Sequence, residues 1–113
     1  MGVRSDVGIA LKKGLAKKVL KECEELFDYA DEHLKHKEGS LFVFRDIKWY
    51  TVEDKGIALL YKFLQRAKAA HYLVVEACLD YPASDEGDIG GWYYNPWGLC
   101  KCVSATIEYE KKP

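Results

Sequence analysis

The stretch LFVFRDIKWY at residues 41–50 combines aromatic and β-branched side chains at a density typical of a β-strand. Side chains along a strand alternate between its two faces. One face is expected to carry four apolar residues, Leu41, Val43, Ile47 and Trp49. The opposite face is expected to carry Phe42, Phe44, Asp46, Lys48 and Tyr50. Because both faces hold apolar residues, the pattern indicates a central strand, or one whose outer face is also covered.

Two amphipathic helices are expected to flank this strand. The segment at residues 14–35 spaces its apolar side chains three and four apart, which places them on one stripe of a helix. This stripe consists of Leu15, Val19, Cys23, Leu26, Phe27, Ala30 and Leu34. A basic last turn followed by Gly39 marks the expected end of this helix. The second helix is expected at residues 53–67, with an apolar stripe of Leu59, Leu60, Phe63, Leu64 and Ala67.

Further strands are expected before, between and after the helices. Val7, Ile9 and Leu11 alternate with small residues, which favours a short strand over a helix capped by Ser5 or Asp6. Glycines at positions 8 and 14 support the strand, since each costs a helix about 1 kcal/mol. Strands are also expected at residues 71–80 and 100–109. In the latter, Val103, Ala105, Ile107 and Tyr109 share one face, and Cys102, Ser104, Thr106 and Glu108 share the other.

The resulting order is (β)αβαββ, which predicts an α+β fold. The sheet is expected to be small, mixed or antiparallel, with three or four strands and two helices packed on one face. The strands at residues 41–50 and 71–80 are expected to be either parallel or separated within the sheet. A length of 113 residues and a hydrophobic share of 49% fit a single domain over residues 1–113. A sheet face that two helices leave bare is a candidate surface for a partner.

The net charge of the chain is close to zero, but its charges are unevenly distributed. Seventeen basic and eighteen acidic residues give a formal charge of −1. This total excludes a nucleic-acid binder that works by bulk charge, and it excludes a strongly acidic mimic of nucleic acid. Residues 1–21 nevertheless hold six bases and one acid, whereas residues 76–110 hold seven acids and one base. Electrostatic attraction is therefore expected to be local.

Membrane, export and metal-binding signals are weak in this sequence. No apolar run approaches the roughly 20 residues needed to span a bilayer, and the first residues lack the apolar stretch of a signal peptide. We therefore expect a soluble, cytoplasmic protein with reduced cysteines at positions 23, 78, 100 and 102. One Cys-x-Cys and the pair His33 and His36, expected at a helix end, do not form the knuckles of a zinc site. Neither a metal nor a cofactor is expected.

The segment GWYYNPWG at residues 91–98 is the most unusual, and it belongs to a long predicted loop at residues 82–98. Trp and Tyr are enriched at binding hot spots and offer a large contact area with few rotatable bonds. Acidic residues precede this segment and would attract a basic surface. The predicted protein-binding site consists of Trp92, Tyr93, Tyr94, Trp97, Asp80, Asp85, Glu86 and Asp88. As an alternative, one or two of these rings cover the bare face of the sheet.

Two other functions remain as alternatives, because no catalytic motif is present and no catalytic residue can be named. The first is a small metal-dependent enzyme built on the acids of residues 76–88, which include Glu76, Asp80, Asp85 and Asp88. The second is an accessory protein that contacts nucleic acid through the basic residues of positions 12–21. Lys12, Lys13, Lys17 and Lys18 are its candidate contacts, although the overall charge makes direct nucleic-acid binding the less favoured alternative.

The segments GVRSDVGIALKKG at residues 2–14 and LFVFRDIKWYT at residues 41–51 resemble small uncharacterised proteins encoded by tailed bacteriophages and prophages. The best-matching piece is Asp46-Ile47-Lys48-Trp49-Tyr50, while GWYYNPWGLCKC at residues 91–102 departs from that pattern. The resemblance implies an accessory protein that binds and blocks a host protein in the bacterial cytoplasm, such as an anti-CRISPR or other anti-defence inhibitor. We therefore expect a non-catalytic inhibitor or adaptor for a host protein with a basic surface. The sequence is compatible with either a monomer or a homodimer.

Overall fold

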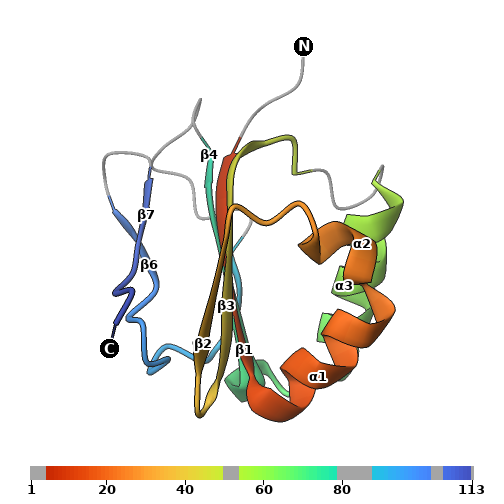
Figure 1. Ribbon diagram of the computed structural model, residues 1–113, viewed down its shortest axis with the longest axis horizontal. Helices are drawn as coiled ribbons and strands as arrows, with labels where there is room; N and C mark the ends of the chain where they lie inside the picture. The colour runs from red at the N-terminus through yellow and green to blue at the C-terminus, as the bar shows by residue number, and fades with distance from the viewer. Residues whose placement is uncertain (1–4, 50–53, 79–87, 103–105, 113) are drawn as a thin grey trace.

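A five-stranded antiparallel sheet separates the helices from a C-terminal hairpin in the computed structural model, which describes residues 5–49, 54–78, 88–102 and 106–112 (Figure 1). The strands of the sheet, in spatial order, are β2 (Glu32–His36), β3 (Gly39–Ile47), β1 (Ser5–Lys12), β4 (Tyr72–Cys78) and β5 (Ile89–Gly90). The helices are α1 (Lys13–Glu22), α2 (Glu24–Phe27), α3 (Lys55–Arg66) and the short 3₁₀ helix η1 (Ala69–His71). The hairpin consists of β6 (Cys100–Cys102) and β7 (Thr106–Glu108). The predicted α+β fold is confirmed, and the Cα radius of gyration of 12.8 Å matches the roughly 13 Å expected of one domain of this length.

Two hydrophobic cores lie on the two faces of this sheet. The helix-side core joins α1, α2 and α3 to the sheet through Val7, Ile9, Leu11, Ala16, Val19, Cys23, Leu26, Phe27, Phe42, Phe44, Trp49, Ile57, Leu60, Leu64, Tyr72 and Val74. The hairpin-side core contains Ala10, Leu41, Val43, Leu73, Val75, Ala77, Trp92, Trp97, Leu99 and Ile107. The sheet is therefore covered on both faces, which explains why its central strands are apolar on both sides.

The first strand, β1, is the centre of the sheet and confirms the strand predicted before the first helix. It pairs antiparallel with β3 on one side and with β4 on the other. Because β1 lies between them, β3 and β4 are separated within the sheet. The three larger apolar residues of β1 face the helices, while Gly8 allows a close approach on the other face. A Cβ atom at Gly8 would lie 2.6 Å from Leu99 Cδ1, so a larger residue would force the Leu99 side chain to move.

The predicted alternation of β3 is correct at its start. Leu41 and Val43 lie in the hairpin-side core, while Phe42 and Phe44 lie in the helix-side core. The predicted faces are wrong after Arg45, where both apolar residues change sides. Trp49 is buried in the helix-side core, and Ile47 packs against that same core.

A β-bulge causes this change of face. Ser5 pairs with Ile47 but Val7 pairs with Phe44, so β3 carries one extra residue at this point. Asp46 sits in the bulge with a φ of 49°, in the left-handed region. Its backbone N–H donates a hydrogen bond to Asp6 Oδ1 at 2.9 Å, which compensates for the broken ladder. The extra residue turns every later side chain of the strand to the opposite face. Tyr50, the last residue of the predicted strand, lies outside the described residues.

The helix predicted at residues 14–35 is wrong beyond residue 27. α1 ends before Cys23, whose φ of −117° and ψ of 31° interrupt the helix, and α2 adds only one turn. Residues 32–36 instead form β2, which pairs with β3 through a tight hairpin. His33 and His36 therefore lie on a strand, and Gly39 begins β3 instead of ending a helix. The short segment EHLKH fits the residue spacing of a helix as well as the alternation of a strand. Its pairing with β3 therefore decides its conformation.

The second predicted helix is confirmed as α3. Asp54 caps it, because its Oδ1 accepts a hydrogen bond from the backbone N–H of Ile57 at 3.0 Å. The buried stripe contains Ile57, Leu60 and Leu64. Leu59, which was expected in the stripe, is 39% exposed, because it lies to one side of the buried stripe.

The single strand predicted at residues 100–109 is wrong, because the chain folds back into a hairpin. Cys100 pairs with Glu108 and Cys102 pairs with Thr106, while Val103, Ser104 and Ala105 lie outside the described residues. Folding back lets Ile107 pack on the face that the helices leave bare. The predicted loop at residues 82–98 also contains a short strand, because β5 pairs with the start of β4. Within the described ranges, no helix has the length and hydropathy needed to cross a membrane.

Candidate functional site

The aromatic loop, residues 91–98, leads from β5 to β6 and contains the four predicted aromatic contacts. Trp92 and Trp97 are only 7% and 1% exposed, and their rings pack edge to face with centroids 6.1 Å apart. Both belong to the hairpin-side core, which confirms the alternative that indole rings cover the bare sheet face. Neither indole is therefore available to a partner at the surface. Of the four predicted aromatic contacts, only Tyr93 and Tyr94 are exposed, and their contact with a partner stays a prediction.

Asn95 holds the aromatic loop in its conformation. Its side-chain Nδ2 donates a hydrogen bond to the carbonyl oxygen of Trp92 at 3.0 Å, and its Oδ1 accepts one from the backbone N–H of Leu99 at 2.9 Å. Asn95 is 5% exposed, so water competes little for these bonds. Its own carbonyl oxygen accepts a hydrogen bond from the backbone N–H of Gly98 at 3.1 Å. One buried side chain therefore fixes both ends of the turn.

The entry to the aromatic loop is attached to the start of β4. The carbonyl oxygen of Tyr72 accepts hydrogen bonds from the backbone N–H groups of Gly91 and Trp92, both at 3.0 Å. Gly90 permits this approach with a φ of +94°, and a Cβ atom there would lie 2.3 Å from the Tyr72 carbonyl oxygen. The loop is thus anchored at its entry, at its turn and through two buried indoles.

Tyr93 and Tyr94 are the exposed part of the loop. Tyr93 is 70% exposed and Tyr94 is 96% exposed, although their neighbours on both sides are buried. Tyr93 also lines a groove of about 480 Å³ between the β4–β5 edge and the start of β6. The floor of this groove includes Leu73, Val75 and Leu99. The loop therefore presents Tyr94 to solvent and Tyr93 at a groove with an apolar floor.

The acidic part of the predicted site is only partly described. Asp88 lines the same groove as Tyr93, and its Oδ1 accepts a hydrogen bond from the backbone N–H of Glu76 at 2.9 Å. The structure thus brings Asp88 and Tyr93 together. Asp80, Asp85 and Glu86 lie outside the described residues, and their role stays a prediction. Among the described residues, no three His, Cys, Asp or Glu side chains are placed to hold a metal ion.

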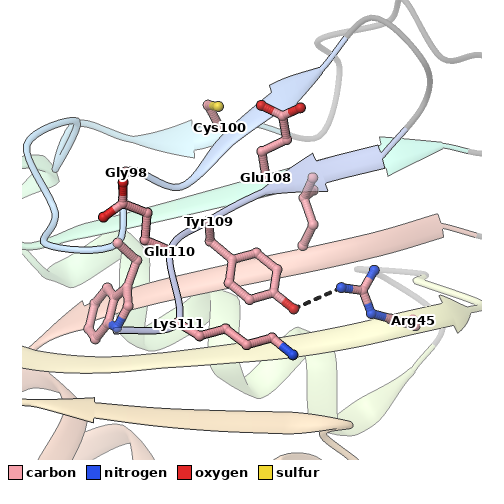
Figure 2. A pocket seen from close by; sticks show the side chains of 9 residues that line it. Arg45, Gly98, Cys100, Glu108, Tyr109, Glu110 and Lys111 are labelled. Atoms are coloured by element: carbon pink, nitrogen blue, oxygen red, sulfur yellow. Dashed lines mark hydrogen bonds between the residues drawn. The ribbon is translucent and has the colours of Figure 1, made fainter. Parts of the chain in front are cut away.

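A second groove, of about 600 Å³, separates the C-terminal segment from β3, and the sequence did not predict it (Figure 2). Figure 2 shows the Tyr109 side chain directed at Arg45, whose Nη2 donates a hydrogen bond to the Tyr109 hydroxyl oxygen at 2.7 Å. Arg45 also lies near Asp6, with Nη1 3.5 Å from Oδ2. The only sequence signal for this groove is a charged Arg45 within an apolar strand.

Glu32 of β2 completes the polar network at this groove. Its Oε2 accepts a hydrogen bond from the Tyr109 hydroxyl, and its Oε1 lies 3.0 Å from Lys111 Nζ. The Tyr109 hydrogen bond holds the pKa of Glu32 below its ordinary value, against the opposing effect of burial. Burial, followed by the bond to Glu32, raises the pKa of Tyr109. These groups bind one another, so the network fastens the C-terminal segment to the sheet.

The cysteines with described side chains occupy two different environments. Cys23 lies in the helix-side core, and burial raises the pKa of its thiol, which keeps it protonated at neutral pH. Cys100 is exposed at the start of β6 and lines the groove beside Tyr93.

Comparisons of the chain with models of protein families, with curated proteins and with solved structures found no match. The two exposed tyrosines, the apolar groove beside Tyr93 and the buried anchors beneath them are therefore the observations from which a function can be inferred.

Proposed function

We propose that this protein is a non-catalytic binding module that holds a partner protein against Tyr93 and Tyr94. One observation carries the proposal: two large rings stand 70% and 96% exposed on a loop that buried groups hold in place. Tyrosine side chains supply much of the energy at protein interfaces. A loop already fixed in one conformation loses little entropy on binding, which favours affinity.

The groove beside Tyr93 indicates what the partner presents. Leu73, Val75 and Leu99 form an apolar floor that suits one buried apolar side chain of a partner. Asp88 lines the same groove, and its negative charge would attract a basic group of the partner. The partner surface we propose therefore combines an apolar side chain with a neighbouring lysine or arginine.

The resemblance of residues 2–14 and 41–51 to small phage proteins supports a proposal for the kind of partner. Under this extension, the partner is a host protein, for example a component of a defence system such as CRISPR–Cas, and binding inhibits or redirects it. The acids Asp80, Asp85 and Glu86 would add long-range attraction to a basic surface.

Paired tyrosine variants test the proposal. The double variant Tyr93→Ala/Tyr94→Ala removes both rings, while Tyr29→Ala removes a ring that is 76% exposed beyond α2 and serves as the matched control. Each protein is immobilised, incubated with a bacterial host lysate and analysed by quantitative mass spectrometry. Proteins retained by the wild type and by Tyr29→Ala should be absent with the double variant.

The retained protein is then purified and its affinity measured by calorimetry. The double variant should bind at least about tenfold more weakly, which corresponds to about 1.4 kcal/mol. Circular dichroism spectra should be the same for all three proteins. Equal affinity of the double variant and the wild type for every retained protein would refute the proposal.

A further inference from the structure

A basic groove of about 300 Å³ lies between α1 and the β2–β3 hairpin, away from the aromatic loop. Three lysine side chains line it, namely Lys13, Lys17 and Lys35, above an apolar floor that includes Ala16 and Leu20, and His36 borders it. None of the residues that the structure describes along this groove is acidic. The fold thus joins bases of α1 to bases of β2 that are about twenty positions apart in the sequence.

The three lysine side chains of this groove can reach a ligand in solution. Lys13, Lys17 and Lys35 are exposed. His36 is partly buried, and its Nδ1 accepts a hydrogen bond from the backbone N–H of Glu38 at 3.1 Å. The His36 ring also packs edge-on against Trp97, with centroids 6.1 Å apart, so the three lysines supply the charge of the groove. The carboxylate of Glu38 lies 3.8 Å from the same Nδ1, but that side chain is 59% exposed and does not line the groove.

The lysines of α1 extend the groove into a row of positive charge. Lys13, Lys17 and Lys21 are spaced four residues apart and are exposed, so they follow one side of the helix at intervals of about 6 Å. The start of α1 has no side-chain cap and no acid in its first turn, although the backbone N–H of Lys13 already donates a hydrogen bond to the Glu38 carbonyl oxygen at 2.9 Å. A row of charges matches a ligand with regularly spaced negative charges better than it matches a single anion.

We propose that this groove binds the phosphate backbone of a nucleic acid, a function beyond the protein-binding role of the tyrosines. Lysine ammonium groups are point charges suited to phosphates, and the groove lacks the aromatic platform that would stack bases. Binding is therefore independent of sequence and depends strongly on salt. The overall charge of −1 conceals this surface because the acids are concentrated in other segments, mainly residues 22–32 and 76–110.

Fluorescence anisotropy of the full chain with labelled DNA tests this proposal. The probes are a single strand of about 20 nucleotides and its duplex, each at several NaCl concentrations between about 20 and 200 mM. The variant Lys17→Glu/Lys35→Glu reverses two charges of the groove. The control Lys62→Glu/Lys68→Glu makes the same change in net charge at exposed positions on α3 and just after it.

Wild type and control should bind DNA with similar affinity, and the groove variant should bind at least about tenfold more weakly. For the duplex, the slope of log K against log salt should become shallower by about 0.9 for each phosphate that the variant no longer neutralises. The variant Tyr93→Ala/Tyr94→Ala should bind DNA like the wild type, so this test is independent of the proposed function. Melting temperatures are measured for each variant, and Lys17→Gln serves as a milder second variant that should also weaken binding.

Three outcomes would overturn the proposal. The first is no change in anisotropy with either probe at the lowest salt concentration. The second is an equal loss of affinity in the groove variant and the control, which would show bulk charge instead of a site. The third is binding to vesicles of phosphatidylcholine and phosphatidylglycerol, abolished in the groove variant, without binding to DNA. That result would assign the groove to a lipid surface.

Discussion

Asn95 closes the aromatic loop onto Trp92 through a hydrogen bond of 3.0 Å between its side-chain Nδ2 and the Trp92 carbonyl oxygen. The side-chain Oδ1 of Asn95 also accepts a hydrogen bond from the backbone N–H of Leu99 at 2.9 Å. Tyr93 and Tyr94 lie between the two residues that this bond joins. A buried polar contact thus flanks the two exposed rings, and we expect the conformation of the loop to depend on it.

Replacing Asn95 with alanine should lower the free energy of unfolding by about 2–6 kcal/mol. The variant leaves a buried carbonyl oxygen and a buried N–H group without partners, and each costs about 1–3 kcal/mol. Urea denaturation measures the change. Tyr94→Ala, at a position 96% exposed, is the control and should stay within about 0.5 kcal/mol of the wild type. An Asn95→Ala variant as stable as this control would contradict the assigned role.

Trp97→Ala should destabilise the protein by about 3–5 kcal/mol, because the ring is 1% exposed within the hairpin-side core. Trp97→Phe should cost clearly less than Trp97→Ala. The indole N–H has no hydrogen-bond partner among the described residues, so its removal leaves no other group unpaired. Thermal and urea unfolding of both variants check the order. If Trp97→Ala kept wild-type stability, the ring would not be a core residue.

The left-handed backbone of Asp46 in the bulge predicts that the stability of the protein depends on which residue occupies this position. With a φ of 49°, the site suits Asn or Asp and disfavours a β-branched side chain. Asp46→Val should therefore be less stable than Asp46→Asn by about 1–2 kcal/mol. The comparison of the two variants isolates backbone conformation, because both remove the charge. Equal stability in urea would argue against a left-handed residue here.

Glu32→Gln should make stability less dependent on pH. The folded-state pKa of Glu32 is depressed, chiefly by the Tyr109 hydrogen bond, so its charge stabilises the fold above the unfolded pKa of about 4.5. That contribution disappears as pH falls through the folded pKa. Near pH 7 the variant should be less stable by about 1 kcal/mol, and the difference should shrink below about pH 4.

Urea denaturation of wild type and Glu32→Gln at several pH values between about 3 and 7 measures this difference. Glu24→Gln is an exposed control on α2 and should show no such convergence. A constant difference at all pH values would show that the carboxylate contributes through packing alone.

Local periodicity was sufficient to predict several elements. The alternation of Leu41 to Phe44 correctly assigned two faces of β3, and the alternation from Val7 to Leu11 correctly favoured a strand. Asp54 and the stripe through Leu60 and Leu64 account for α3 in the same way. These features depend on neighbouring residues, so they can be recognised without knowing what they pack against.

The predictions of secondary structure and of strand faces were wrong where contacts between residues far apart in the chain decided the conformation. Residues 32–36 follow a helical pattern that began far upstream, and only hydrogen bonds to β3 make them a strand. The faces of Ile47 and Trp49 were reversed because the bulge arises from pairing with β1. Residues 100–109 alternate like one strand, yet the segment folds back so that Ile107 packs on the sheet.

The candidate sites divide in the same way. Sequence alone identified residues 91–98 as an unusual aromatic segment and residues 12–21 as basic. It could not distinguish the buried Trp92 and Trp97 from the exposed Tyr93 and Tyr94, since burial depends on which sheet face the helices leave uncovered. Composition and local periodicity thus determined the α+β class and identified the candidate segments. Only tertiary structure decided which rings face solvent and which lysines share a groove, because both depend on contacts between residues far apart in the chain.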